Sequence, residues 1–72
     1  MNTIELAKKF LEIADELNEA VSRYIDGSNA PEDEKAYWIV RDADRAFIDS
    51  LRNEYGESYE YGLNYELAES FI

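Results

Sequence analysis

Two long stretches of the chain carry apolar residues at spacings of four and three. Side chains spaced in this way lie on one face of an α-helix. In the first stretch the regular positions are Leu6, Phe10, Ile13, Leu17, Ala20 and Tyr24. The same side is widened by Ile4, Ala7, Leu11, Ala14, Val21 and Ile25. An apolar arc of this width is typical of a helix that contacts two neighbours, so the chain is predicted to fold as packed helices.

Residues that begin and end helices bound the first stretch at about residues 3–26. Asn2 or Thr3 is placed to cap its start, and Glu5 follows Asn2 by three positions, as in a capping box. Gly27 is placed to end it, because glycine readily adopts the left-handed conformation found after helix C-termini. The first helix is therefore predicted to stop where a polar loop begins.

The second stretch is predicted to form a helix over about residues 31–55. Pro31 stands at its first position, where the missing N–H of proline removes no helical hydrogen bond. Acidic residues fill the first turn, where the helix dipole favours negative charge. Gly56 is placed to end this helix. Its expected core positions are Ala36, Val40, Ala43, Phe47 and Leu51.

The last segment, from residue 57 to residue 72, shows two periodicities. Alternation predicts a strand through Tyr59, Tyr61, Leu63, Tyr65 and Leu67. A spacing of four predicts a helix through Tyr59, Leu63, Leu67 and Phe71. A lone strand would lack an intramolecular partner for its backbone, so we predict a helix over about residues 58–71.

The chain is therefore predicted to be all-α and to form one domain over residues 1–72. We expect a small three-helix bundle made of two long helices and a shorter C-terminal helix. A chain of this length buries only roughly 60% of the surface that its unfolded form exposes, so its core is marginal. Dimerisation is a second way to gain stability, and the sequence leaves monomer and dimer open.

Composition argues against catalysis. The sequence contains no histidine and no cysteine, which removes the commonest general base, the commonest metal ligands and disulfides. The acids of residues 26–34 lack the alternating spacing of a calcium loop. The glycines do not form a phosphate-binding loop, and a chain this short does not easily form a substrate cleft. We therefore expect a protein that is not an enzyme and needs no metal or cofactor.

The charge balance indicates the kind of partner. Seventeen acidic residues outnumber seven basic ones, which gives a net charge of −10. This charge disfavours direct contact with nucleic acid or anionic membranes and favours encounter with a basic protein. No apolar run reaches the length of a membrane-spanning helix, and the first residues lack the pattern of a signal peptide. The expected location is the cytoplasm.

Acidic residues recur along one side of the first predicted helix. Glu12, Glu16 and Glu19 lie roughly 5–6 Å apart along the helix axis, and phosphates of one DNA strand are about 3.4 Å apart. Both are rows of negative charge on a rigid rod, so these residues are candidates for binding a basic groove. The alternative is an ordinary solvated face, which Lys8 and Arg23 interrupt.

The C-terminal segment combines acids with aromatics. Residues 53–72 contain no lysine or arginine, and they hold four of the six tyrosines. Tyrosine is enriched at protein interfaces. Solvated helices usually gain stability from opposite-charge pairs three or four residues apart, and this segment has no basic residue to form them. The alternative is that some of the tyrosines belong to the core. The candidate partner-binding residues of this segment are Glu54, Glu57, Tyr59, Glu60, Tyr61, Tyr65, Glu66 and Glu69.

Trp38 is the remaining candidate, because it lies on the polar side of the second predicted helix, opposite Val40 and Phe47. A tryptophan in this place is either covered by another helix or offered to a partner. We favour covering by the third helix, which has to pack somewhere. Arg41 and Arg45 are spaced to stack on the indole as cation–π pairs.

In size, charge and its acidic–aromatic segment, the chain resembles the small acidic inhibitors that phages and mobile elements use against host defence. These include anti-restriction and anti-CRISPR proteins, several of which mimic DNA. The resemblance is one of type and assigns no individual residues. It implies an inhibitor that occupies the nucleic-acid-binding surface of a basic host protein.

A second function is consistent with the same sequence. The chain would then be a homo-oligomeric regulatory or structural module of the antitoxin or adaptor type. In that case a second copy covers the stripe of Leu6, Phe10, Ile13 and Leu17.

Overall fold

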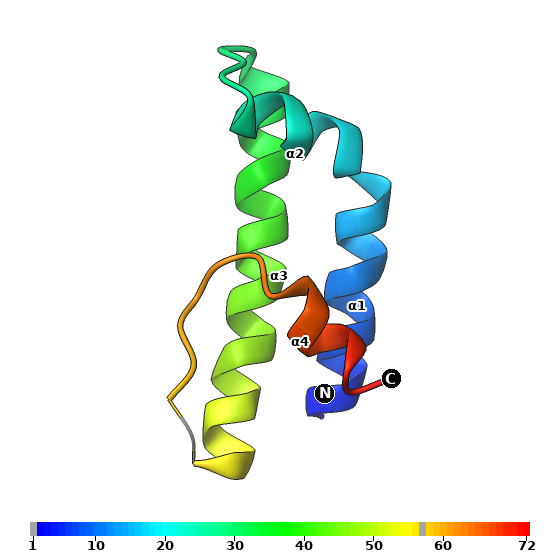
Figure 1. Ribbon diagram of the computed structural model, residues 1–72, viewed down its shortest axis with the longest axis vertical. Coiled ribbons are helices and arrows are strands. Elements are labelled where there is room, and N and C mark those ends of the chain that lie inside the picture. The colour runs from blue at the N-terminus through cyan, green and yellow to red at the C-terminus, as the bar shows by residue number, and fades with distance from the viewer. Residues whose placement is uncertain (1, 57) are drawn as a thin grey trace.

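The computed structural model describes residues 2–56 and 58–72, and within them the protein is helical, with no strand. Four helices follow one another along the chain (Figure 1): α1 (Thr3–Glu16), α2 (Asn18–Ile25), α3 (Pro31–Tyr55) and α4 (Tyr65–Glu69). The prediction of an all-α chain is confirmed. The arrangement differs from the expected three helices, because the first helix is divided and the last is short. No helix in the described part of the chain is long and apolar enough to cross a bilayer.

The first predicted helix bends at Leu17 and becomes two. Its start is as expected, because the Asn2 side chain accepts a hydrogen bond of 2.8 Å from the backbone N–H of Glu5. At Leu17 the backbone leaves the helical region, with φ −104° and ψ 11°. Leu17 ends one helix and starts the next, because its N–H donates to the carbonyl of Ile13 in α1 and its carbonyl accepts from the N–H of Val21 in α2. The bend carries α2 across the first half of α3 (Figure 1) and buries Val21 there.

Helix α3 begins and ends where the sequence predicts. Pro31 occupies its first position, and Gly56 follows its last turn in the left-handed conformation with φ 68°. Helix α3 runs antiparallel to α1 (Figure 1), so the start of α1 meets the end of α3. The buried Thr3 hydroxyl joins these ends through Ser50 Oγ at 2.8 Å and Glu54 Oε2 at 2.6 Å.

Aromatic rings form the centre of the core. The ring of Phe10 in α1 stacks on the ring of Tyr65 in α4, with their centroids 5.4 Å apart. The centroid of the Phe47 ring in α3 lies 6.3 Å from that of Phe10. The same core cluster contains both small and large apolar side chains. The buried apolar residues are Ala7, Phe10, Ala14, Val21, Ala36, Val40, Phe47, Ile48, Leu51 and Ala68. Of the regular apolar positions predicted for the first helix, Phe10 is fully buried, and the others are only half-buried: Leu6, Ile13, Leu17, Ala20 and Tyr24.

The predicted helix over residues 58–71 is wrong for its first half. Helix α4 covers only Tyr65–Glu69, and residues 58–64 follow α3 back toward its middle as an irregular segment (Figure 1). The physical reason is Asp44, a fully buried carboxylate on α3. It accepts hydrogen bonds from the backbone N–H of Gly62 at 2.9 Å, and from the backbone and side-chain nitrogens of Asn64 at 3.1 and 2.7 Å. The strand alternative is also wrong for these residues.

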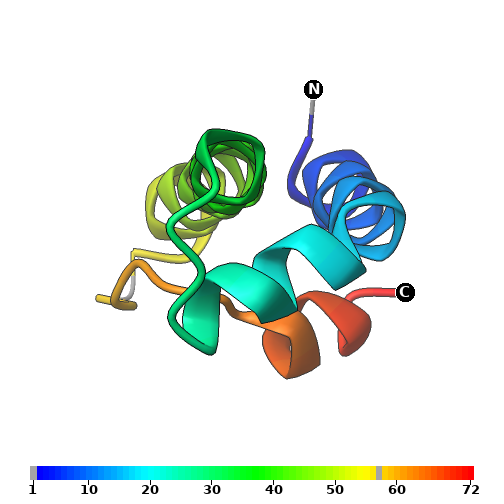
Figure 2. The same cartoon turned by 90° about the horizontal axis from the view of Figure 1, so that it is seen from above.

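Helices α2 and α4 lie on the same side of the α1–α3 pair (Figure 2). Helix α1 contacts α3 and α4, which confirms the prediction that its broad apolar arc serves two neighbours. On the opposite side of the pair, Figure 2 shows no further helix. The fold therefore has one covered face and one open face.

An ion pair fixes the loop between α2 and α3. The Arg23 guanidinium donates to both carboxylate oxygens of Asp33 at 3.0–3.1 Å, and the Ser28 hydroxyl donates to the same carboxylate at 2.7 Å. Asp33 is buried, whereas Arg23 is largely exposed. These hydrogen bonds from Arg23, and then from Ser28, lower the pKa of Asp33 despite its burial. Hydrogen bonding to Asp33 correspondingly raises the pKa of Arg23.

We expect the variant Asp44→Ala to lower the free energy of unfolding by about 2–4 kcal/mol, because it removes the acceptor of buried N–H groups. The loss should be measured by urea denaturation followed by circular dichroism. Hydrogen exchange should accelerate over residues 58–69. Asp42→Ala is the matched control, since Asp42 is exposed on the same helix, and it should change stability by less than about 0.5 kcal/mol. Equal losses in the two variants would contradict the anchoring role of Asp44.

The second prediction concerns acid. Because the pKa of Asp33 is lower in the folded than in the unfolded chain, its ionised form stabilises the fold above the ordinary aspartate pKa. The stability difference between the wild type and Asp33→Asn should be constant above about pH 5. It should shrink as the pH falls through about 3.9 and vanish below the lowered pKa. Arg23→Gln should reduce the same pH dependence, and a difference that persists at the lowest pH would refute this account.

Candidate functional site

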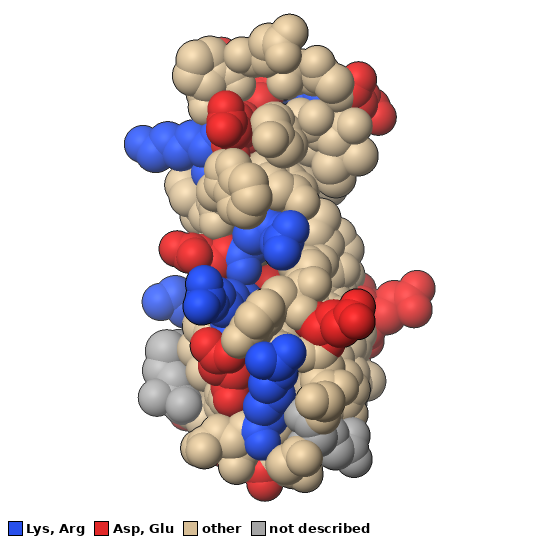
Figure 3. Space-filling model, turned by 90° about the vertical axis from the view of Figure 1, so that its left-hand side faces the viewer, with Lys and Arg blue, Asp and Glu red and all other residues tan. Residues whose placement is uncertain are grey.

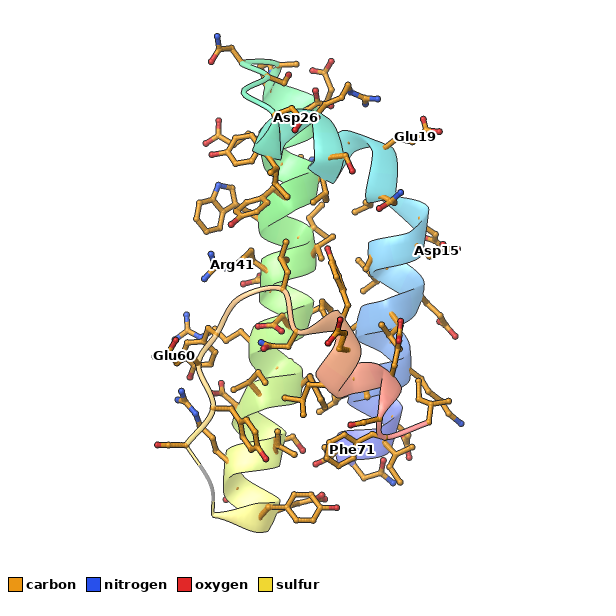
Figure 4. The ribbon with its side chains drawn as sticks, in the orientation of Figure 1. Asp15, Glu19, Asp26, Arg41, Glu60 and Phe71 are labelled. Carbon is orange, nitrogen blue, oxygen red and sulfur yellow. The ribbon has the colours of Figure 1, made fainter. Side chains whose placement is uncertain are left out.

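The predicted acidic residues of the first helix are all solvent-exposed. Glu12 and Glu16 lie on α1, and Glu19 lies in the first turn of α2, beyond the bend at Leu17. In Figure 4 the side chains of Asp15 and Glu19 point away from α3. Between Lys9 and Arg23 the chain has no basic residue that would neutralise these carboxylates.

Helix α4 brings a second group of carboxylates to the same side. Glu66 and Glu69 are exposed on α4, which packs against α1. Asp15 of α1 and Glu69 of α4 line one hollow, together with Asn18 and the half-buried Tyr65. The two segments that lack lysine and arginine therefore meet there. We give the name acidic surface to the exposed carboxylates of these two segments, of which Asp15 and Glu69 line the same hollow: Glu12, Asp15, Glu16, Glu19, Glu66 and Glu69.

Two of the predicted tyrosines belong to the core, as the alternative reading of the segment allowed. Tyr65 stacks on Phe10. Burial raises the pKa of the Tyr65 hydroxyl, and electrostatic interaction with the nearby Asp44 and Tyr37 raises this pKa further. Tyr59 is half-buried and packs against the core. These rings hold the C-terminal segment in place and offer little surface to a partner.

The other predicted acids of the C-terminal segment lie apart from the acidic surface. Glu54 is exposed at the end of α3, where its carboxylate accepts the hydrogen bond from Thr3. Glu60 is exposed on the irregular segment, on the side of α3 that faces away from α1 (Figure 4). Glu57 lies outside the described residues.

Trp38 remains half-exposed, so the expectation that the third helix covers it is wrong. Its relative exposure is 52%, because α4 packs on α1 and the irregular segment passes further along α3. The central carbon of the Arg41 guanidinium lies 5.7 Å from the centroid of the Trp38 ring, as expected for a cation–π pair. Arg45 instead lies over the ring of Tyr61, at 5.3 Å. Together with Asp42, these residues line a second hollow, which we call the arginine–aromatic hollow.

Lysine and arginine side chains gather along this side of the molecule (Figure 3). Arg41, Arg45 and Arg52 all belong to α3, and Tyr61 lies against Arg52 as well as Arg45. The predicted site is thus divided in space. The carboxylates that carry the acidic surface belong to α1, α2 and α4, whereas the exposed aromatics Trp38 and Tyr61 lie beside the arginines of α3.

A third feature is an apolar groove on the open face between α1 and α3. It has a volume of about 240 Å³ and is lined by Leu6, Lys9, Phe10, Ile13, Ile39, Asp42, Ala43 and Ala46. Every lining residue belongs to α1 or α3, in agreement with the absence of α2 and α4 from this face in Figure 2. Ile39 is 41% exposed at its edge.

The sequence did not predict Asp15, Arg41 or Arg45 as partner-binding residues. The signal for Asp15 was present, because it lies within the basic-free stretch of α1 and α2. The role of Arg45 depends on where the irregular segment places Tyr61, which helical periodicity could not indicate. In the part of the chain that the structure describes, no cluster of three or more acidic side chains is arranged to hold a metal ion.

Comparison with protein-family models, with curated proteins and with solved structures finds no match to this chain.

Proposed function

We propose that this protein is a non-catalytic inhibitor that acts in the cytoplasm of a host cell. Its acidic surface would occupy the nucleic-acid-binding surface of a basic protein, in the manner of DNA-mimicking anti-CRISPR and other phage anti-defence proteins. The observation that carries the proposal is the junction of α1 and α4, where Asp15 and Glu69 line one hollow. Two separate basic-free segments combine there into one surface.

Electrostatics supports this assignment. Carboxylates form strong charge-assisted hydrogen bonds with lysine and arginine, the residues that proteins use to hold phosphates. With a net charge of −10, the molecule attracts basic surfaces over a distance and speeds the encounter with them. The carboxylates of Glu12 and Glu16 project from a helix packed on two sides, so little order has to be gained on binding.

The structure changes one element of the expected mechanism. The sequence offers tyrosines and Trp38 as candidate residues for the same partner-binding surface as the carboxylates. Tyr59 and Tyr65 are packed in the core, and Trp38 and Tyr61 lie on the arginine side of α3. The proposed contact is therefore mainly polar, and its affinity should depend strongly on salt.

Reversing Glu12, Glu16 and Glu19 to lysine should abolish the inhibitory contact while α1 and α2 stay folded. The variant changes the net charge from −10 to −4, because each reversal adds two charges. Proteins from a host extract should be captured on the immobilised wild type and identified by mass spectrometry. The captured partner should be released by nucleic acid, and its association should slow as salt rises from about 50 to about 500 mM.

A variant of the same net charge separates the acidic surface from overall charge. Asp26, Glu34 and Glu60 are exposed, lie outside the acidic surface, and should be reversed to lysine together. This control should retain the partner. A partner that binds both variants equally, or whose binding ignores salt, would exclude the proposed inhibitory mechanism.

The apolar groove favours the second candidate, a homo-oligomeric helical module. In that case the groove is covered by another copy of the chain, which would complete the open face between α1 and α3. A two-fold arrangement that sets α1 against α3 of the other copy would place Lys9 near Asp42, so that opposite charges meet at the groove edge.

Under this alternative the molar mass should double from 8.4 kDa as protein concentration rises. Light scattering coupled to size-exclusion chromatography measures this directly. Ile39→Glu should keep the chain monomeric, because it places a charge in the groove. Ile25→Glu is the control, since Ile25 is 60% exposed away from the groove. A wild type that stays monomeric at millimolar concentration would rule out the homo-oligomer.

A further inference from the structure

The arginine–aromatic hollow contains guanidinium groups that the protein leaves without acidic partners. Among the described residues, Arg23 and Asp33 form an ion pair, whereas neither Arg41 nor Arg45 forms one. Arg41 donates one hydrogen bond, to the Tyr37 hydroxyl at 3.1 Å. Among residues 2–56 and 58–72, the contact of the Arg45 guanidinium is its stacking on the Tyr61 ring. A guanidinium has five N–H donors, so most of the donors of this pair are available.

This arrangement is unusual because carboxylates are abundant in the protein. Acidic residues number 17 against seven basic ones, and Asp42 itself lines the hollow. Asp42 nevertheless comes within ion-pair distance of neither arginine. The two guanidiniums therefore keep their capacity for an external anion.

The walls of the hollow are held in fixed positions. The Tyr61 hydroxyl donates to Asp49 Oδ1 at 2.5 Å and accepts from Arg52 at 3.1 Å. Arg52 also bonds the carbonyl of Tyr59 at 2.9 Å through Nε. Next to Tyr61, the N–H of Gly62 is bound by the buried Asp44. On the other wall the Trp38 ring meets Tyr37 edge to face at 5.2 Å. A site whose side chains are already ordered loses less entropy when a partner binds.

The residue types and the size of the hollow indicate the class of ligand. Tryptophan, tyrosine and arginine are the residues most enriched at binding hot spots. The volume of about 160 Å³ is below the roughly 300–1,000 Å³ of small-molecule sites and suits one or two side chains of a protein partner. Two guanidiniums select carboxylates, and the exposed indole selects an apolar or aromatic neighbour of those carboxylates.

We propose that the arginine–aromatic hollow binds an acidic peptide segment of a partner protein, with its carboxylates on Arg41 and Arg45 and an apolar side chain on Trp38. Nucleic acid is disfavoured, because single strands are bound along extended basic grooves and this hollow is short and edged by Asp42. The surface is separate from the acidic surface, so the proposal does not depend on the proposed inhibitory function. One chain would then contact a basic partner and an acidic partner on different sides.

Trp38 is the single tryptophan of the chain, so its fluorescence reports on this hollow alone. The probe is a nonapeptide with one phenylalanine flanked on each side by four glutamates. At about 150 mM salt, which screens the long-range repulsion between the acidic peptide and a protein of net charge −10, it should shift the Trp38 emission in a saturable way. The double variant Arg41→Gln/Arg45→Gln should bind it about tenfold more weakly or worse. Asp42→Asn should bind it more tightly, because it removes a like charge from the hollow.

The matched control is Lys8→Gln/Lys9→Gln, which removes the same two positive charges from α1 and should bind as the wild type does. Circular dichroism should show the same helix content in all variants. Equal weakening in the two double variants, or no saturable shift with the wild type, would overturn the proposal.

Two further measurements test whether the hollow binds nucleic acid or a second copy of the chain in place of an acidic peptide. A thymidine decanucleotide that binds as tightly as the peptide would assign the hollow to nucleic acid and overturn the acidic-peptide assignment. An emission shift on concentrating the protein alone, abolished in Arg41→Gln/Arg45→Gln, would assign the hollow to a second copy and overturn the assignment to a separate partner. Absence of both effects, with peptide binding, is the expected result.

Discussion

The buried carboxylate of Asp44 determines how the second half of the molecule is arranged. A charge in the interior is costly unless hydrogen bonds satisfy it, and here the donors are N–H groups of Gly62 and Asn64. To supply them, the chain after α3 has to run back beside that helix. Helix α4 can then start at Tyr65 and reach α1, where Tyr65 stacks on Phe10. The fold thus uses one polar contact to direct the apolar packing of its C-terminal segment.

This arrangement keeps the arginines of α3 apart from the basic-free stretches of α1, α2 and α4, although Asp42 and Glu60 lie on the arginine side. Helix α4 adds its glutamates to the acidic side of α1, and the irregular segment places Tyr61 among the arginines of α3. A different path for residues 58–64 would mix the two sets. The opposite characters of the two sides follow from the path of the chain, because neither side is formed by consecutive residues alone.

The start of α1 and both ends of α3 could be predicted from the sequence because their signals are local, whereas the bend at Leu17 was not predicted. The cap at Asn2, the proline at the start of α3 and the left-handed Gly56 lie where the sequence predicts them. The conformation of the C-terminal segment could not be predicted in this way, because it depends on Asp44, which is 20 residues before Asn64. A lone aspartate in a helix pattern looks like a solvated residue. For the same reason the exposure of Glu12 and Glu16 could be predicted, whereas the grouping of Asp15 with Glu69 could not.

Helix α4 has five residues, far fewer than the roughly 12–15 that an isolated helix needs to be even marginally stable in water. It forms because α1 and Asp44 hold it, so the acidic surface is a property of the complete fold. Recognition through the proposed acidic surface would then depend on the folding equilibrium. Anything that loosens the C-terminal segment, such as warming, would reduce the number of binding-competent molecules even while α1 and α3 remain helical. The activity of such a protein would therefore have a temperature limit of its own, below the melting of its two long helices.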